Sequence, residues 1–126
     1  MIGVHIFLEL INTLQTTTYF TVTEFVARPH TIEEKIVQEL GEEFVAIGIC
    51  ESGLRQYDEG QVLISETADV GIFQINQVHW DNAEALGIDI ETIDGNIEYA
   101  KILKNQRGTK DWYMSEECWR NIAYNN

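Results

Sequence analysis

The most regular alternation of apolar and polar positions begins just after Pro29, the only proline of the chain. Thr31 followed by Glu34 forms a capping box, in which each side chain can satisfy a free backbone N–H group at a helix start. Behind it, apolar residues recur on one helical face, namely Ile32, Ile36, Val37 and Leu40. Gly41 suits the left-handed residue that ends a helix. The pattern predicts an amphipathic helix that ends before Gly41.

The next apolar stretch, residues 44–50, contains almost no polar atoms. Glu42 and Glu43 precede it, where the dipole of a helix N-terminus favours anions. A helix that is apolar on every side is a buried, central one. The chain becomes polar again at Glu51-Ser-Gly53. The sequence therefore predicts a central buried helix that ends at Glu51.

The rest of the chain predicts two more helices and a small lobe of another kind. Residues 54–70 lack helical periodicity and contain one strand-like run at 61–64, which indicates a short hairpin or an irregular lobe. Residues 70–76 are compact and apolar and predict a buried strand or turn against the central helix. One helix is expected from residue 94 or 96 to residue 107, and another is expected to be capped by Ser115. The fold class is α+β and mostly helical.

Residues 1–30 differ in character from residues 31–126, which hold the expected domain. Residues 2–14 are mostly apolar, but polar residues interrupt them and no Lys or Arg precedes them, so they match neither an export signal nor a membrane span cleanly. Residues 16–23 are β-branched and aromatic, which is typical of extended chain. A degenerate export signal and a structural arm are both open for residues 1–30.

Length and charge limit the function classes. The chain has 126 residues, enough for one domain with a core of its own. Eight Lys and Arg against 21 Asp and Glu give a net charge of −13. Nucleic-acid partners need a basic face and are not expected, and adsorption to an anionic membrane is disfavoured. Because the three histidines and two cysteines are isolated, we expect no metal and no cofactor, and we expect a monomer.

Glu51 is the residue whose position most suggests chemistry. A carboxyl directly behind a buried helix loses part of its hydration, and desolvation raises its pKa. A glutamic acid with a raised pKa can donate a proton near neutral pH, as the general acid of a glycosidase must. The alternative is an ordinary solvated glutamate at a helix end. The position of Glu51 alone leaves both open.

An ordered set of short motifs shifts this balance. Its parts are Glu51-Ser-Gly, then Ser65 six positions before Gly71-Ile-Phe-Gln, then Asn96-Ile. The set resembles the soluble lytic transglycosylase and goose-type lysozyme group, which shows a catalytic Glu-Ser pair, a Ser-x-x-Gly-Ala-x-Gly-Leu-Met-Gln segment and a later Asn-Ile-x-x-Gly-x-x-Tyr-Leu helix. The resemblance covers about residues 43–103. The departures from the family pattern are Ala68, Asp69, Ala100 and Leu103.

The resemblance implies a lysozyme-like fold over residues 31–126 and cleavage of the β-1,4 bond between N-acetylmuramic acid and N-acetylglucosamine in peptidoglycan. Glu51 is then the proton donor. Three polar residues are expected to orient the glycan, namely Ser65, Gln74 and Asn76. With peptidoglycan strands as the partner, the protein is expected outside the cell or in the cell envelope.

Aromatic residues and a glycine are further candidates in the implied cleft. Trp80 can stack on a sugar ring or belong to the core. Tyr99, on the helix that carries Asn96, is a candidate to reach the cleft and bond near the catalytic carboxyl. Gly71 is expected to let the backbone approach the sugar. The other two tryptophans are expected in the core, namely Trp112 and Trp119.

The reaction type depends on a second carboxylate. Goose-type lysozymes carry extra aspartates at two positions that are Ser65 and Asn76 here, and neither side chain can act as a base. The pattern therefore favours the lytic-transglycosylase reaction, in which groups of the substrate replace an enzyme nucleophile and water and leave a 1,6-anhydromuramic acid end. Asp69 and Asp58 are the rival candidates for a second carboxylate, which would make the enzyme a hydrolase.

Cys50 and Cys118 allow three interpretations. A disulfide between the central and the C-terminal helix suits an exported wall enzyme, and two separate buried thiols are the alternative. A cysteine hydrolase that uses Cys50 is the third, although no histidine of the chain lies in a peptidase motif. A non-catalytic glycan-binding or structural domain of the same fold also stays open beside the enzyme.

Overall fold

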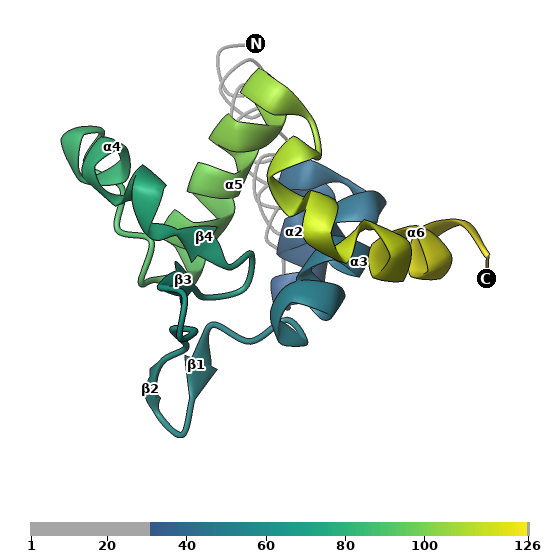
Figure 1. Cartoon of the computed structure of the whole chain (residues 1–126), viewed down its shortest axis with the longest axis horizontal. Coiled ribbons are helices and arrows are strands. Elements are labelled where there is room, and N and C mark those ends of the chain that lie inside the picture. Colours follow the sequence, from purple (N-terminus) through teal and green to yellow (C-terminus); the bar gives the residue numbers. More distant parts are fainter. Residues whose placement is uncertain (1–30, 126) are drawn as a thin grey trace, which may run out of the picture. The chain divides into compact units, whose positions relative to one another are not determined.

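Five α-helices make up most of the part of the chain that the structure, a computed structural model, describes, residues 31–125 (Figure 1). They are α2 (Ile32–Leu40), α3 (Glu42–Ser52), α4 (Trp80–Ala85), α5 (Ile93–Arg107) and α6 (Glu116–Tyr124). Two 3-10 segments precede α4 and α6, at Gln77–His79 and Lys110–Ser115. The prediction of a mostly helical α+β chain is confirmed. The predicted export signal or arm lies outside the described residues.

Helices α2 and α3 form where the local signals predict them. The Thr31 hydroxyl accepts a hydrogen bond from the Glu34 backbone N–H at 3.1 Å, and Gly41, with φ of 94°, separates α2 from α3. Helix α3 packs against both α2 and α6, and it ends at Gly53, which has the left-handed conformation. Burial on every side is not complete, because Ile49 is 41% exposed.

Two short antiparallel hairpins form the smaller lobe. Strand β1 (Tyr57–Asp58) pairs with β2 (Gln61–Val62), which confirms the hairpin predicted within residues 54–70. Strand β3 (Asp69–Val70) pairs with β4 (Ile75–Asn76), and residues 71–74 form the turn between them. Figure 1 shows the hairpins and α4 on one side, α2, α3 and α6 on the other, and α5 between them.

Two fully buried amide side chains hold the 71–74 turn in place. Gln56 Oε1 accepts a hydrogen bond from Ile72 N at 3.1 Å, and Gln56 Nε2 donates to the Ile90 carbonyl at 3.0 Å. Asn96 Oδ1 accepts from Phe73 N at 3.0 Å. Since buried backbone groups must find partners, these amides substitute for the strand partners that the turn lacks. Asn96, the first residue of the Asn-Ile motif, therefore has a structural role in holding this turn.

Gly71 serves the same network. Its φ is +71°, and a Cβ at this position would lie 2.3 Å from Gln56 Oε1 and 2.6 Å from Asn96 Nδ2. The close approach that requires glycine is an approach to buried amides. We expected this glycine to make room for a sugar, but the space that it leaves is taken by the buried amides.

The later helices differ in detail from their predictions. Helix α5 begins at Ile93 because Thr92 caps it, its hydroxyl accepting from Gly95 N at 3.0 Å. Helix α6 follows Ser115 as expected, but the Ser115 side chain makes no capping hydrogen bond. That prediction of a cap is wrong because the hydroxyl donates elsewhere, as described below. Helix α4 was not predicted from the pattern, since its six residues span less than two turns.

A disulfide joins α3 to α6. Cys50 and Cys118 are bonded, with their Cα atoms 6.1 Å apart. Trp112 and Trp119 lie in the core, as predicted, at 3% and 1% exposure. Among the residues that the structure describes, no helix has the length and apolar character needed to cross a membrane.

Candidate active site

A cleft of about 450 Å³ opens between the end of α3 and the β3–β4 hairpin. It is lined by Glu51, Ser65, Thr67, Asp69, Gln74, Ile75, Asn76, Val78, His79, Leu103, Asp111, Trp112 and Met114. The cleft thus brings together five residues singled out from the sequence, namely Glu51, Ser65, Asp69, Gln74 and Asn76. Four of them were expected in the cleft from the resemblance, whereas Asp69 departs from the family pattern and was a rival candidate for a second carboxylate.

Glu51 lies in the last turn of α3 and is half-buried. Burial raises the pKa of Glu51, and the negative charge of Asp69 raises it further. A hydrogen bond that Glu51 Oε1 accepts from the Ser115 hydroxyl acts in the opposite direction without cancelling the rise. The carboxyl therefore keeps its proton to a higher pH than an ordinary glutamate.

The pKa of Asp69 is shifted in the opposite direction, below its ordinary value. Burial by itself would raise its pKa, but hydrogen bonds to the carboxylate from Thr67, Asn76 and Ser65 outweigh burial and lower the pKa. Ser65 Oγ donates at 2.9 Å and Asn76 Nδ2 at 2.7 Å, and the Thr67 hydroxyl donates to the same oxygen as Ser65. Three donors around one carboxylate keep it ionised.

The hairpin explains why these donors meet at Asp69. Asp69 and Asn76 are direct partners in the β3–β4 register, and Ser65 Oγ also accepts from Asp69 N at 3.1 Å. Ser65 and Asn76 therefore do not act on their own, because both donate hydrogen bonds to the carboxylate that lies between them.

Together, Glu51 and Asp69 form a pair of carboxyl groups whose pKa values are shifted in opposite directions. They line the same cleft, and the charge of Asp69 acts on Glu51. Carboxyl groups whose pKa values are pushed apart can act as an acid and as an anion at the same pH. This arrangement can protonate a leaving group on one side and stabilise positive charge on the other.

Gln74 presents an amide to the cleft from a restrained backbone. Its φ is 48°, a conformation that residues with a side chain rarely adopt. Gln74 Nε2 donates to the Gly71 carbonyl at 2.9 Å, which fixes the side chain over its own turn. Strained backbone of this kind is often found where a side chain must be aimed at a ligand.

Several residues in or beside the cleft were not singled out from the sequence as site residues. Ser115 contacts Glu51 directly, and Thr67 contacts Asp69. His79 Nε2 lies 3.7 Å from Asp111 Oδ1, and Arg107 lies 3.5 Å from the same oxygen. Ser115 was recognised only as a helix cap. Its contact with Glu51 and the contact of His79 with Asp111 join segments that are distant in the sequence.

Two predicted sugar contacts do not line this cleft. Trp80 lines a different pocket, where its indole Nε1 donates to the Ile75 carbonyl at 3.3 Å. Tyr99 is 1% exposed, and its hydroxyl accepts a hydrogen bond from Asn82 Nδ2 at 3.0 Å. Tyr99 instead packs its ring 5.7 Å from the ring of His79. Neither residue lines the cleft, because Trp80 begins α4 and the Tyr99 side chain is buried in the core.

The other candidate chemistries also change. Asp58 does not line the cleft and pairs with Arg55 at 3.3 Å on the exposed hairpin. The disulfide leaves no thiol at Cys50 for a cysteine hydrolase. Within residues 31–125, no group of three or more His, Cys, Asp or Glu side chains is arranged to hold a metal ion.

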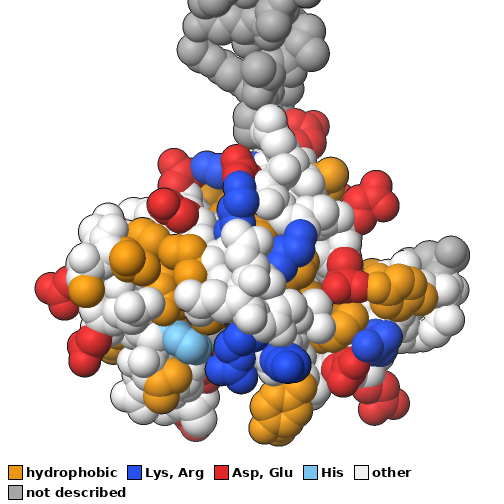
Figure 2. Space-filling view, turned by 90° about the horizontal axis from the view of Figure 1, so that it is seen from above, with side chains coloured by type: hydrophobic (Ala, Val, Ile, Leu, Met, Phe, Trp, Pro, Cys, Tyr) orange, Lys and Arg blue, Asp and Glu red, His pale blue; other side chains and the backbone are white. Residues whose placement is uncertain are grey.

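Charge is unevenly spread over the surface. On the face shown in Figure 2, Lys and Arg side chains gather towards the middle and most Asp and Glu side chains lie along the margin. Arg107, beside the cleft residue Asp111, is part of the basic end of α5. The net charge of −13 is therefore not evenly presented to a ligand.

Comparison of the chain with known protein families, with curated proteins and with solved structures found no match.

Proposed function

We propose that this chain is a glycosidase that cleaves peptidoglycan, with a lysozyme-like fold and with Glu51 as the general acid. The observation that carries the proposal is the pair of carboxyl groups in one cleft, Glu51 with a raised pKa and Asp69 with a lowered one. Glycosidases use two such groups on either side of the scissile bond. The motif resemblance supports the choice of peptidoglycan as the substrate.

In this reaction Glu51 gives its proton to the glycosidic oxygen while the bond from that oxygen to the muramic acid carbon breaks. Positive charge develops on the sugar ring, and the Asp69 carboxylate stabilises it. Gln74 supplies an amide for the hydroxyl or acetamido groups of the glycan. Glu51, now ionised, then takes the proton from the group that attacks the sugar.

The attacking group is either water or the 6-hydroxyl of the substrate. The sequence favours the 6-hydroxyl and an anhydro product, because Ser65 and Asn76 stand where aspartates are found in goose-type lysozymes. The contacts of these two residues with Asp69 support the other reaction, since they keep a carboxylate ionised in the cleft. We therefore place hydrolysis first and the anhydro-forming reaction second.

The disulfide supports a location outside the reducing cytoplasm. Disulfides persist in secreted and envelope proteins, and peptidoglycan is found there. Cys50 directly precedes Glu51 in α3, and its disulfide bond to Cys118 connects that helix to α6. It therefore fixes the helix end that carries the general acid.

Digestion of purified peptidoglycan tests the proposal. Glu51→Gln keeps the shape of the side chain but has no acidic proton, so the release of soluble muropeptides is expected to fall by about 10²–10⁴-fold. Glu42→Gln is the matched control, because it makes the same change at the exposed start of the same helix. Its activity is expected to equal that of the wild type.

Two outcomes would contradict the proposal. A folded Glu51→Gln protein with near-normal release would remove Glu51 from the reaction. Wild-type protein that sediments with peptidoglycan but releases nothing would instead identify a non-catalytic glycan-binding domain.

A further inference from the structure

A second pocket, of about 390 Å³, lies between Val70 of the β3–β4 hairpin, helix α4 and residues 87–91. Its apolar part consists of Trp80 and of the buried side chains of Val70, Ala83 and Ile90. Trp80 is 36% exposed, and its hydrogen bond to the Ile75 carbonyl holds the indole in a fixed orientation. The pocket therefore has a rigid aromatic wall and an aliphatic floor.

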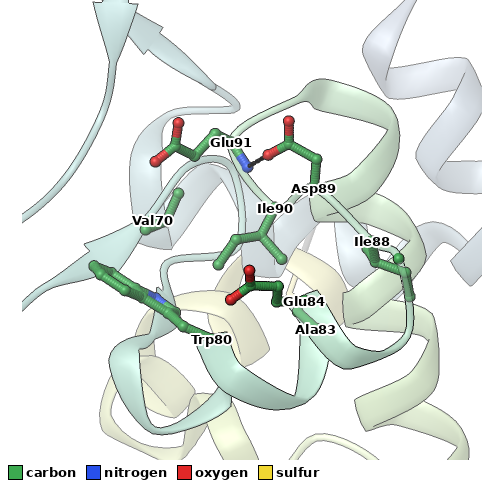
Figure 3. Close-up of a pocket in the computed structure, with 9 residues that line it drawn as sticks. Val70, Trp80, Ala83, Glu84, Ile88, Asp89, Ile90 and Glu91 are labelled. Carbon is green, nitrogen blue, oxygen red and sulfur yellow. Dashed lines mark hydrogen bonds between the residues drawn. The ribbon is translucent and has the colours of Figure 1, made fainter.

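Its polar lining is entirely acidic. Glu84, Asp89 and Glu91 line the pocket, and no Lys, Arg or His does. Figure 3 shows the Glu84 carboxylate pointing into the space between Trp80 and Ile90. Asp89 accepts the Glu91 backbone N–H at 3.0 Å, whereas in the described part of the chain no ion pair or hydrogen bond engages the Glu84 or Glu91 carboxylate.

These features favour one chemical class of ligand. An aliphatic chain fills the apolar floor, and an ammonium group at its end is attracted by the indole face and by the free carboxylates. A neutral apolar group would gain nothing from these exposed carboxylates, and an anion would be repelled. A primary ammonium on a chain of several carbons fits both the apolar floor and the acidic lining.

The pocket is also close to the candidate active site. Val70 lines the pocket and its register partner Ile75 lines the cleft, while His79 of the cleft directly precedes Trp80 of the pocket. The pocket and the cleft therefore share the β3–β4 hairpin and adjoin at residues 79 and 80. Peptidoglycan carries peptide stems that contain a diamino acid, and these stems extend from the glycan strand.

We infer that this pocket binds the free ammonium-bearing side chain of the diamino acid in the peptide stem of peptidoglycan. The inference rests on the proposed function for the source of the ligand, but not for its chemistry. It assigns to Glu84, Glu91 and Trp80 a part in substrate selection, so that glycan strands with stems free of cross-links bind best.

Binding of a small probe tests the chemistry without any catalysis. Nα-acetyl-lysine methylamide is expected to shift the NMR signal of the Trp80 indole N–H and to bind at least about 3-fold more tightly than the neutral norleucine analogue. Glu84→Gln/Glu91→Gln is expected to abolish that preference. Glu33→Gln/Glu117→Gln removes the same charge from exposed positions outside the pocket and is expected to preserve it. Equal affinity for the two probes, or a preference unchanged by the pocket substitutions, would overturn the inference.

Sedimentation with peptidoglycan tests the source of the ligand. In the Glu51→Gln background, which leaves the polymer undigested, acetylation of the stem amines is expected to weaken binding at least about 3-fold. The same acetylation is expected to have a smaller effect when Glu84 and Glu91 are also replaced by Gln. An equal effect in both proteins would overturn the assignment to the stem. The proposed function fails separately, through absence of glycan cleavage by the wild type.

Discussion

Replacement of Gly71 by alanine is expected to destabilise the domain much more than its backbone conformation alone requires. The added methyl group would lie 2.3 Å from Gln56 Oε1 and 2.6 Å from Asn96 Nδ2. These amides are 2% and 0% exposed, so neither can rotate into solvent to avoid it. The substitution therefore has to break the hydrogen bonds that hold the 71–74 turn.

Two contributions give the magnitude. A residue with a Cβ in the left-handed region costs about 1–2 kcal/mol relative to glycine. Displacement of Gln56 Oε1 breaks its bond from Ile72 N, and displacement of Asn96 Nδ2 breaks its bond to the Val70 carbonyl. Each buried group left without a partner costs about 1–3 kcal/mol. The free energy of unfolding is thus expected to fall by at least about 3 kcal/mol, a large part of the ~5–15 kcal/mol of a typical domain.

Gly87→Ala provides a matched control. Gly87 has a φ of +72°, against +71° for Gly71, but nothing lies within 4 Å of a Cβ there. Its substitution is expected to cost only the backbone contribution of about 1–2 kcal/mol. Urea unfolding of both variants, without reductant, measures the difference, which we expect to be about 2 kcal/mol or more. A Gly71→Ala protein within about 0.5 kcal/mol of Gly87→Ala would refute the role of Gly71 in the buried network.

Further predictions concern the acid, the disulfide and charge. Ser115→Ala removes a hydrogen bond that lowers the pKa of Glu51, so the fall of kcat/KM at high pH is expected to move to higher pH; an unmoved profile contradicts this. The raised pKa means that ionised Glu51 destabilises the folded state, so Glu51→Gln is expected to stabilise the protein at neutral pH. Urea titrations should show this gain in stability decreasing as the pH falls through the pKa of Glu51. A gain that persists at low pH refutes the prediction. Reduction of Cys50–Cys118, which closes a loop of 68 positions, is expected to lower stability in urea by up to about 4 kcal/mol, and no change would contradict the constraint. Moderate salt is expected to raise the initial rate on intact cell wall, because the protein has a net charge of −13 and the polymer carries carboxylates. Rates that fall steadily from low salt upward would show that the basic side chains of α5 dominate.

Local signals were sufficient for helices α2 and α3. The capping residue Thr31, the terminal Gly41 and Gly53 and the apolar run in α3 act within one or two turns, so their effect does not depend on the rest of the fold. For the same reason Glu51 could be recognised as a carboxyl at the end of a buried helix. Its raised pKa follows from that burial.

The remainder of the site depends on contacts that local patterns do not encode. Gln56 carries no signal of its own, although it fixes the turn behind the cleft. Asp69 was one rival among two carboxylates, and only the β3–β4 register brings Asn76 beside it. Ser115 lies 64 residues from Glu51 in the sequence, and a serine before a helix is more often a cap than a partner for a carboxyl.

Mass spectrometry of the muropeptide ends released from purified peptidoglycan tests the central claim most directly, because it reports both the cleaved bond and the group that attacks it. We expect fragments that end in reducing N-acetylmuramic acid, released by the wild type and lost in Glu51→Gln and in Asp69→Asn. Fragments that end only in 1,6-anhydromuramic acid, each one water lighter, with Asp69→Asn fully active, would contradict the role of Asp69. Absence of any glycan fragment from the wild-type digest would contradict the glycosidase itself.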